Sequence, residues 1–262
     1  MRTQNWPAEA IWEAVAPALP GFTVEVLPEV DSTNTELMRR ARAGQLDPVL
    51  LVTERQTAGR GRMNRPWLGE PGDALAFSLG IPLAPLDWSG LSLAAGVAVA
   101  ESLQAQGSAA RLGLKWPNDL WLWDAAAGRK LGGILVETAG AAGDAVRYAV
   151  IGVGLNIRPR PAQGLSTPPA WLQELWPGID APQALLRVAA PLSAMVARFA
   201  AEGFAPLEPR FRALDLLRGR AVHLSDGLQG TAQGVRADGT LLVRTADGLH
   251  AVTSAEVSVR PA

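Results

Sequence analysis

The 262-residue sequence lacks cysteine and has only two histidines, His223 and His250, both near its C-terminal end. Without cysteine, the protein has no disulfide framework, no thiolate nucleophile and no cysteine-ligated metal site. Two histidines also argue against a histidine metal cluster. Any chemistry must therefore use lysine, arginine, carboxylates, amides or the backbone.

An excess of charge of either sign is missing as well. Lysine and arginine total 24 against 25 acidic residues, and 48% of the residues are hydrophobic. This balance is typical of a soluble globular protein and implies no general affinity for nucleic acid or for an anionic membrane. The length allows one main domain with a full core and a small second domain.

Long hydrophobic runs are absent too. The most apolar stretch, residues 74–100, contains Pro82 and Pro85, which divide it into two shorter elements. The first 19 residues contain two glutamates and no uninterrupted apolar segment, so they do not resemble a signal peptide. We expect a cytoplasmic protein with no membrane contact.

Hydrophobic periodicity predicts an α+β fold in which helices cover a mixed β-sheet. Helices are expected over residues 6–19, 33–44, 91–103 and 181–199, and strands over residues 22–30, 49–53, 74–81, 112–116, 120–123, 131–137 and 146–157. The pattern Thr33-x-x-Glu36 is a capping box that would start the second helix. Four prolines within residues 158–169 indicate a surface loop.

The chain changes character after about Leu217. Three Asp-Gly pairs, at residues 226–227, 238–239 and 247–248, separate short β-type runs over residues 221–224, 231–235, 241–244 and 249–252. Asp-Gly is a preferred hairpin turn, so these runs predict a small all-β barrel. We therefore expect two domains, residues 1–216 and 217–262.

The most unusual stretch runs from Gln56 to Trp67 and reads QTAGRGRMNRPW. Arginine offers fixed bidentate donors to phosphate, and glycine lets backbone N–H groups approach an anion closely, so the loop suits a phosphate-bearing ligand. A solvated hairpin loop is the alternative, and it is the commoner explanation of an isolated Arg-Gly-Arg. RNA binding would need a basic surface that the rest of the chain does not supply.

A lysine at a strand end is the second candidate, within the segment LGLKWPND at residues 112–119. Strand alternation places Gly113 on the same face as Lys115, where the missing side chain leaves room beside the ammonium. Lysines at strand ends usually lie at the surface, but apolar neighbours and a following proline favour a charge that faces a pocket. Asn118 and Asp119 could cap the turn or hold a nucleotide and its metal, and the turn is the simpler interpretation.

Two further strands carry glycines where side chains would otherwise stand. In KLGGILVE, residues 130–137, Gly132 and Gly133 indicate close approach of a ligand or of another backbone, with a bulge as the alternative. In GVGLNI, residues 152–157, alternation puts two glycines and Asn156 on one face. That face either leaves space for a ligand or allows tight packing of a helix, and the sequence leaves both interpretations open.

The segment DSTNTE, residues 31–36, offers hydroxyls and an amide at a helix N-terminus, whose free N–H donors attract anions and polar ligand groups. A capping box explains Thr33 and Glu36 without a ligand. It leaves Ser32 and Asn34 unexplained, which makes them candidate binding residues.

Taken together and in this order, the five segments resemble the biotin protein ligase family. The shared residues are Ser32-Thr33-Asn34, Gln56 with Gly59-Arg60-Gly61-Arg62-x-x-Arg65-x-Trp67, Lys115 to Asp119, Lys130 to Leu135, and Gly152 to Asn156. Each motif alone is weak, but five of them in the family's order argue strongly against coincidence. The family also has a small SH3-like C-terminal barrel, which agrees with the β pattern after Leu217.

The resemblance implies a two-step reaction. The carboxylate of biotin attacks the α-phosphorus of ATP, giving biotinoyl-5′-AMP and pyrophosphate, and a lysine of a biotin carboxyl carrier protein domain then attacks the mixed anhydride. ATP and biotin would be the substrates, and Mg²⁺ would accompany the ATP phosphates, since no motif indicates a metal site of the protein's own. The chain would act as a monomer or a homodimer.

The resemblance also implies roles for individual residues. Lys115 and Arg62 would be catalytic, with Lys115 at the biotin carboxylate and the α-phosphate. Biotin would be bound by Ser32, Thr33, Asn34, Gln56, Gly59, Arg60, Gly61, Arg62, Lys115, Leu131, Gly132 and Gly133. The nucleotide would be bound by Arg62, Arg65, Trp67, Asn118 and Asn156. The loop from Gln56 to Trp67, called the Arg-Gly loop below, would close over the adenylate and exclude water.

Two alternative functions remain. Lipoate–protein ligases share the fold and the adenylation step, but their resemblance to the Arg-Gly loop with Trp67 is weaker. A non-catalytic sensor would bind biotin or a nucleotide without releasing pyrophosphate, and would not need Lys115. Bifunctional members of the family carry an N-terminal DNA-binding domain; about thirty residues precede Ser32, so we expect the ligase alone and no DNA binding.

Overall fold

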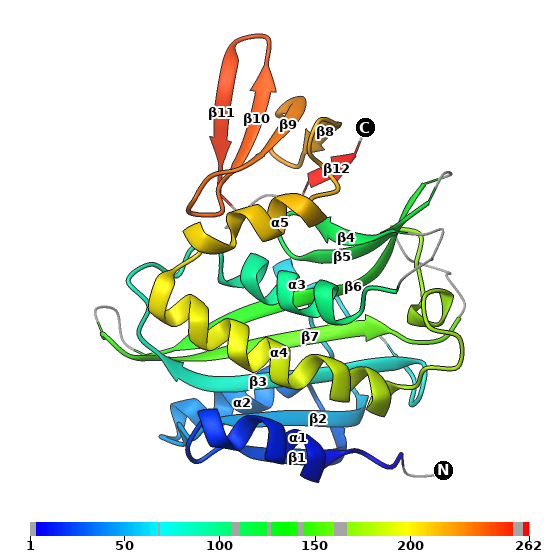
Figure 1. Cartoon of the computed structure of the whole chain (residues 1–262), viewed down its shortest axis with the longest axis vertical. Coiled ribbons are helices and arrows are strands. Elements are labelled where there is room, and N and C mark those ends of the chain that lie inside the picture. The colour runs from blue at the N-terminus through cyan, green and yellow to red at the C-terminus, as the bar shows by residue number, and fades with distance from the viewer. Residues whose placement is uncertain are drawn as a thin grey trace.

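The computed structural model describes residues 4–67, 69–105, 111–124, 127–140, 144–159, 167–253 and 259–261. Within them, a seven-stranded mixed sheet and a five-stranded antiparallel sheet follow one another along the long axis of the molecule (Figure 1). The expected α+β class, a helix-covered mixed sheet followed by a small β domain, is confirmed.

The larger sheet has the strand order β1-β2-β3-β7-β6-β5-β4. Its strands are β1 (Thr23–Val30), β2 (Val49–Gln56), β3 (Ala74–Leu83), β4 (Arg111–Lys115), β5 (Asp119–Trp123), β6 (Gly128–Ala139) and β7 (Arg147–Asn156). The β1–β2 pair is parallel, and all other neighbours in this sheet are antiparallel. Every strand predicted for this region is present, with shifted ends.

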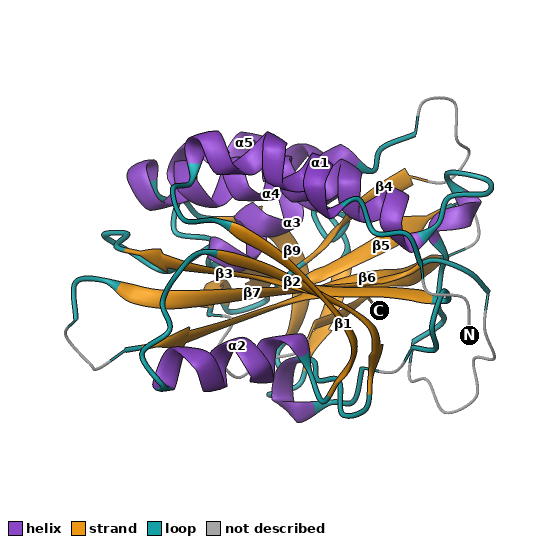
Figure 2. Cartoon of the chain, turned by 90° about the horizontal axis from the view of Figure 1, so that it is seen from below, coloured by secondary structure: helices purple, strands orange, loops and turns teal. Residues whose placement is uncertain are grey.

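Helices cover both faces of the larger sheet. They are α1 (Ala8–Val15), α2 (Thr33–Arg42), α3 (Leu91–Ser102), α4 (Ala181–Glu202) and α5 (Glu208–Leu214). Figure 2 shows α2 on one face and the other four helices on the opposite face. The helix predicted over residues 6–19 is shorter than expected and continues as a 3₁₀ turn at Ala16–Ala18, because Pro17 has no N–H to extend an α-helix.

The main core lies between the sheet and the four-helix face, and a smaller core lies under α2. The helix predicted over residues 91–103 is present as α3, and its small residues allow it to be almost wholly buried. By length and composition α4 is apolar enough to cross a membrane, but half of its most apolar segment is buried and it packs on α3. This burial is that of a core helix in a soluble protein.

Helix α2 begins at the predicted residue but with a different cap. Ser32 is the N-cap residue, and its Oγ accepts a hydrogen bond from the Thr35 N–H at 3.4 Å. Glu36 does not close the predicted capping box with Thr33, because it pairs with two arginines of the next turn. The Thr33 side chain is thereby left to make contacts inside the fold.

The small sheet has the order β11-β10-β9-β8-β12. Its strands are β8 (Ala221–Leu224), β9 (Gln229–Val235), β10 (Leu241–Thr245), β11 (Gly248–Val252) and β12 (Val259–Pro261). The three Asp-Gly pairs form the predicted turns, and Gly227, Gly239 and Gly248 have φ of 94°, 80° and 136°, a region that favours glycine. Strand β12 was not predicted, because three residues are too short to show a period.

The small sheet lies over β4, which is the edge strand of the larger sheet. On the α3 face, Trp116 Nε1 donates a hydrogen bond to the Gly239 carbonyl oxygen at 3.0 Å. On the other face, the Arg220 guanidinium lies 4.0 Å from the centroid of the Trp123 ring. Along the edge itself, the Leu216 N–H donates to a β4 carbonyl oxygen at 3.0 Å. The C-terminal part of the chain therefore contacts the edge of the larger sheet at β4, just after β4 and at the end of β5.

Candidate active site

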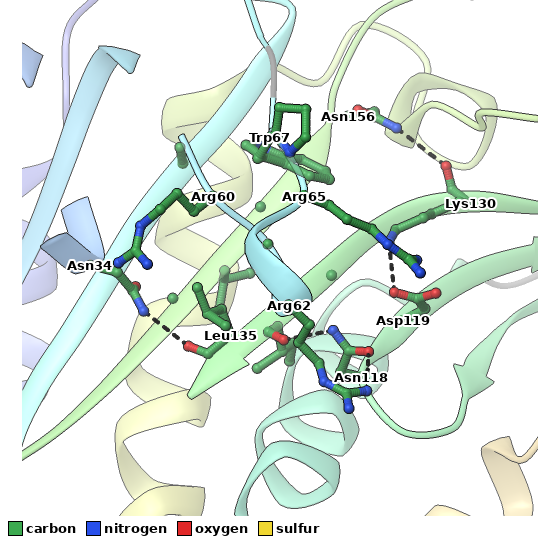
Figure 3. Close-up of a pocket in the computed structure, with 18 of the residues that line it drawn as sticks. Asn34, Arg60, Arg62, Arg65, Trp67, Asn118, Asp119, Lys130, Leu135 and Asn156 are labelled. Atoms are coloured by element: carbon green, nitrogen blue, oxygen red, sulfur yellow. Dashed lines mark hydrogen bonds and ion pairs between the residues drawn. The ribbon is translucent and has the colours of Figure 1, made fainter. Parts of the chain in front are cut away.

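A cavity of about 650 Å³ lies on the α2 face of the larger sheet, beneath the Arg-Gly loop (Figure 3). All but three of the predicted site residues line it, and they come from all five sequence segments. These residues are Ser32, Thr33, Asn34, Gln56, Arg60, Gly61, Arg62, Arg65, Trp67, Lys115, Asn118, Gly133 and Asn156. Segments that are far apart in the sequence thus converge on one concave site.

The three predicted residues outside the cavity lining are Gly59, Leu131 and Gly132. Leu131 is fully buried in the main core. A Cβ atom on Gly132 would lie 2.3 Å from the Gly154 carbonyl oxygen, and one on Gly59 would lie 2.4 Å from that of Trp67. Both glycines therefore allow close approach of another backbone. They support the cavity wall without lining the cavity.

The two glycines of β7 make room for side chains of the cavity. A Cβ on Gly152 would lie 2.1 Å from Asn34 Oδ1, and one on Gly154 would lie 2.5 Å from the Trp67 ring. Gly152 thus admits a side chain of α2, and Gly154 admits an aromatic ring from the Arg-Gly loop. Tight packing of a helix, one of the two interpretations left open, holds at Gly152, whereas at Gly154 the space is filled by a side chain of the protein itself. Both glycines also line the cavity.

Hydrogen bonds join the start of α2 to its neighbouring strands at one end of the cavity. Gln56 Oε1 accepts from the Thr33 backbone N–H at 2.9 Å and lies 3.2 Å from Thr33 Oγ1. Ser78 Oγ lies 2.7 Å from Thr33 Oγ1 and 2.6 Å from Asn34 Oδ1, so its single proton serves one of the two. This end of the cavity presents neutral hydrogen-bonding groups.

Glu137 ties α2 and the Arg-Gly loop to β6. Asn34 Nδ2 donates to Glu137 Oε2 at 2.9 Å and to the Leu135 carbonyl oxygen at 3.2 Å. The Arg60 guanidinium lies 3.3 Å from Glu137 Oε1, while Arg60 Nε donates to Thr35 Oγ1 at 3.1 Å. One carboxylate therefore fixes an amide of the cavity wall and the first arginine of the loop.

The Arg-Gly loop closes on itself as a short hairpin. Arg60 and Pro66 form an isolated antiparallel bridge at its base. At its tip, Met63 and Asn64 both have φ of 55°, a left-handed conformation that is uncommon outside glycine. Figure 3 shows the three arginines of this hairpin reaching over the cavity. The loop is thus a hairpin, as the alternative interpretation held, and also a part of the site.

A cluster of buried charges lies at the other end of the cavity. Lys115 and Asp119 are paired residues of the β4–β5 hairpin, with Lys115 Nζ 3.3 Å from the carboxylate. The same carboxylate lies 2.7 Å from Lys130 Nζ. Lys115 is only 7% exposed, and its Nζ lies 5.2 Å from the centroid of the Trp121 ring. The prediction that Lys115 faces a pocket is confirmed.

Burial and charge act against each other in this cluster. Burial lowers the pKa of Lys115, and the neighbouring Asp119 opposes that shift. Burial alone would raise the pKa of Asp119, but the two lysines outweigh it and the pKa is lowered. Burial also lowers the pKa of Arg62, which stays a cation because its ordinary value is so high. With one carboxylate for several cations, this end of the cavity favours anions.

The two predicted asparagines brace the cavity wall. Asn118 Nδ2 donates to the Ile134 carbonyl oxygen at 2.9 Å, and its Oδ1 accepts from Arg62 at 3.4 Å. Asn156 Nδ2 lies 3.2 Å from each of two carbonyl oxygens, one of them that of Lys130. Both amides are engaged by the protein, so any ligand contact must use their remaining hydrogen-bonding capacity.

Gly113 does not leave room beside the ammonium, contrary to the prediction. A Cβ at this position would lie 2.6 Å from the Leu214 carbonyl oxygen and 2.6 Å from Leu216 Cγ. The segment that leads to the small sheet fills the space. The missing side chain thus lets the end of α5 and the residues after it pack against β4.

Lys130 and Glu137 were not predicted as site residues. Simple alternation from Gly133 would turn Lys130 to the opposite face, but the β5–β6 register shifts around Leu131 and brings it to the cavity. Alternation does place Glu137 on the face of Gly133, and that signal could have identified it. Ser78 gave no signal beyond one hydroxyl within an apolar strand.

Comparisons with known proteins agree with this geometry. A model of the biotin/lipoate A/B protein ligase family matches residues 26–156, and a model of the biotin protein ligase C-terminal domain matches residues 219–260. The fold and the cavity therefore define a ligase of the biotin/lipoate type with the C-terminal domain of the biotin branch.

Individual relatives narrow this class. The chain is 36% identical over 252 residues to the bifunctional ligase/repressor BirA of Escherichia coli K12. The aligned residues make up 93% of this chain and 76% of the relative. It is 32% identical to the biotin–[acetyl-CoA-carboxylase] ligase of Paracoccus denitrificans, over 88% of this chain and 98% of the relative. The biotin protein ligase of Aquifex aeolicus, in complex with biotin and ATP, superposes with a TM-score of 0.74 at 28% identity, over 91% of this chain and 99% of that one. The chain belongs to the biotin protein ligase family, as its motifs predict.

Proposed function

We propose that the protein is an ATP-dependent biotin protein ligase, which forms biotinoyl-5′-AMP and transfers the biotinoyl group to a lysine of an acetyl-CoA carboxylase carrier domain. One observation carries the proposal: a single cavity has a neutral hydrogen-bonding end at α2 and a cationic end at Lys115 and Lys130. Biotin has a neutral urea head and an anionic carboxylate, and ATP is a polyanion. The two ends of the cavity match this pair of substrates.

The neutral end suits the urea head of biotin. The Ser32 Oγ accepts from the helix backbone, so its proton remains for a ligand, and Gln56 Nε2 has no partner among the residues described. Thr33 and Asn34 already use most of their hydrogen bonds inside the protein. We therefore expect Ser32 and Gln56 to donate to biotin, while Thr33 and Asn34 fix the shape of this end.

The cationic end suits the first chemical step. A carboxylate oxygen of biotin attacks the α-phosphorus of ATP, a new C–O–P link forms, and the bond to the β-phosphate breaks as pyrophosphate leaves. Two anions must meet in this step, so the buried ammonium of Lys115 lowers the barrier by neutralising their repulsion. Arg62 and Arg65 reach over the same space and would bind phosphate oxygens. Trp67 would pack against the ligand.

In the second step, the carrier lysine attacks the acyl carbon of the mixed anhydride, and AMP leaves. The Arg-Gly loop lies over the cavity and would exclude water that otherwise hydrolyses the anhydride. Among the described residues, no three carboxylate, histidine or cysteine side chains form a group that could hold a metal ion. Asp119 already holds two ammonium groups, so Mg²⁺ would be held mainly by the ATP phosphates.

The proposal extends to the whole chain. We expect two domains, residues 1–216 and 217–262, in a cytoplasmic protein that acts as a monomer or a homodimer. The biotin protein ligase C-terminal domain match at residues 219–260 supports the second domain. Size-exclusion chromatography with light scattering, with and without biotin and ATP, would determine the oligomeric state.

A mass-spectrometric competition tests the function. A biotin carboxyl carrier domain is incubated with the protein, ATP and Mg²⁺, with biotin and lipoate offered together. One biotin-sized adduct on one carrier lysine, dependent on ATP, is the expected result. A lipoyl adduct would assign the protein to the neighbouring ligases, and binding of both ligands without pyrophosphate release would indicate a sensor.

A further inference from the structure

The two lysines of the site are also the only two lysines in the sequence; every other basic side chain among the 24 is arginine. Lys115 and Lys130 both lie in the cavity, and both contact the carboxylate of Asp119. An arginine guanidinium stays protonated and does not accept acyl groups under ordinary conditions. The side-chain amines of this protein are therefore confined to the cavity where the acyl-adenylate would form.

This arrangement poses a chemical problem for a ligase. A mixed anhydride that acylates a carrier lysine can equally acylate a lysine of the cavity, provided that lysine is a neutral amine. Burial lowers the pKa of Lys115, and the nearby cations Lys130 and Arg62 lower it further. Asp119 is the neighbouring group that raises it. The buried amine thus depends on one carboxylate to keep its proton.

We propose that Asp119 protects the ligase from self-acylation by pairing with both lysines and holding Lys115 as an ammonium ion. In this form the Lys115 side chain attracts the carboxylate and phosphates but has no lone pair with which to attack the anhydride. The proposal rests on the proposed function, because it requires biotinoyl-AMP in the cavity. Asp119 acts here as a positioning residue, since it touches the lysines and not the reacting carbon.

The reaction that Asp119 prevents can be written in full. A lysine that has lost one proton to water attacks the carbonyl carbon of biotinoyl-AMP, an N–C bond forms, and the bond from that carbon to the phosphate oxygen breaks. AMP leaves with the electron pair, and the nitrogen loses a second proton. The product is a biotinoyl amide on Lys115, which removes a cation from the site.

The test uses the full-length Asp119→Asn variant with chemically prepared biotinoyl-AMP, so that a loss of adenylation does not hide the result. A matched control is Asp124→Asn, because Asp124 lies just after β5 and pairs with Arg129 rather than with a lysine. Each unit by which a lysine pKa falls raises its neutral fraction about tenfold. We expect at least tenfold faster acylation of Lys115 in Asp119→Asn than in the parent or in the control.

Peptide mapping identifies the modified amine without ambiguity, because the chain offers only two lysines and its N-terminus. Adding Lys115→Arg or Lys130→Arg to Asp119→Asn should remove the adduct at the replaced position. If Asp119→Asn binds biotinoyl-AMP and gains no adduct on either lysine, the proposal is overturned.

The parent protein gives a second measurement, which does not depend on how the variant folds. Asp119, Lys130 and Arg62 are the charged groups that face Lys115 from β5, β6 and the Arg-Gly loop. Raising the pH should therefore bring self-acylation at a cavity lysine. Acylation of the N-terminal amine shows that the pH is high enough for a free amine to react. If the N-terminal amine is acylated and neither cavity lysine is, the proposal is contradicted. Failure of the parent to pass biotin from biotinoyl-AMP to the carrier domain would instead contradict the proposed function.

Discussion

Replacing Lys115 with methionine tests the electrostatic role of the cationic end most directly. Methionine keeps most of the length and volume of lysine and removes only the ammonium. At an effective dielectric constant of about 20, two unit charges about 4 Å apart interact by about 4 kcal/mol, which corresponds to roughly 10³ in rate. Loss of a preorganised donor typically lowers kcat by ~10²–10³. We expect Lys115→Met to slow biotin adenylation by that factor.

The fold should survive the same substitution. Lys115 is held in a site that lowers its pKa through burial, so removing its charge relieves an unfavourable desolvation. Asp119 keeps its contact with Lys130 at 2.7 Å, so no buried carboxylate is left without a partner. The free energy of unfolding should therefore stay within about 1.5 kcal/mol of the parent value.

Two assays separate these effects. Biotin-dependent exchange of pyrophosphate into ATP measures the first step, and transfer from prepared biotinoyl-AMP to the carrier domain measures the second. Urea unfolding of the same samples measures stability. Suppose that Lys115→Met folds normally and exchanges pyrophosphate within about fivefold of the parent rate. This would refute the role assigned to Lys115, because loss of an interaction of about 4 kcal/mol should slow the reaction much more.

Three further changes follow from single contacts. Gly154→Ala places a Cβ 2.5 Å from the Trp67 ring, so the ring must move; we expect weaker retention of biotinoyl-AMP in equilibrium dialysis and a free energy of unfolding lowered by about 1–3 kcal/mol. Glu137→Gln weakens the hold on Asn34 and on the Arg-Gly loop; steady-state kinetics should show a KM for biotin raised about fivefold to tenfold with a smaller change in kcat. Burial raises the pKa of Asp215 above its unfolded value, so the folded state binds more protons and loses stability as the pH rises through that range. Asp215→Asn should therefore gain stability relative to the parent as the pH rises above the ordinary pKa of an aspartate, and a difference in the free energy of urea unfolding that stays flat with pH would contradict this.

Sequence patterns sufficed wherever a local period or a turn determines the structure. The alternation in β7, the Asp-Gly turns and the small-residue helix α3 each follow from one short segment, and the structure confirms them. The segments that line the cavity were found for a different reason. A buried strand usually carries apolar side chains, so glycines and cations within an apolar strand are unusual. Such residues indicate a candidate site.

What the sequence could not show depends on how segments meet. Lys130 faces the cavity only because the register shifts in β6. The Gly132-Gly133 pair left a bulge open as an alternative, but nothing in the sequence showed that it would turn Lys130 toward the cavity. Gly113 was assigned to the space beside the ammonium, because the segment at Leu214 that fills this space lies about a hundred residues further along the chain. The cap of α2 was misassigned for a related reason, since Thr33 contacts the distant Gln56.

The C-terminal part of the chain reaches the cationic end of the cavity by two routes. Arg220 stacks on Trp123, whose ring centroid lies 6.3 Å from that of Trp121, and Lys115 Nζ lies over the Trp121 ring. The second route runs on the opposite face of β4, through the bond from Trp116 to the small sheet. A strand at the edge of a sheet has a neighbour on one side only, so β4 gains its second support from this domain.

The bond between Trp116 Nε1 and the Gly239 carbonyl oxygen can be tested alone, because Trp116→Phe removes the donor and keeps most of the ring. Loss of a buried hydrogen-bond partner costs about 1–3 kcal/mol, and Trp176→Phe is the matched control, since it removes a similar bond to the Leu103 carbonyl oxygen away from β4. Both variants should lose stability, but only Trp116→Phe should lower kcat for adenylation, by about tenfold. In a Lys115→Met background, Trp116→Phe should cause no further fall in kcat. The reason is that the C-terminal domain would act by positioning the Lys115 ammonium, which this background lacks. Equal losses of activity in both tryptophan variants would mean that the C-terminal sheet only stabilises the fold.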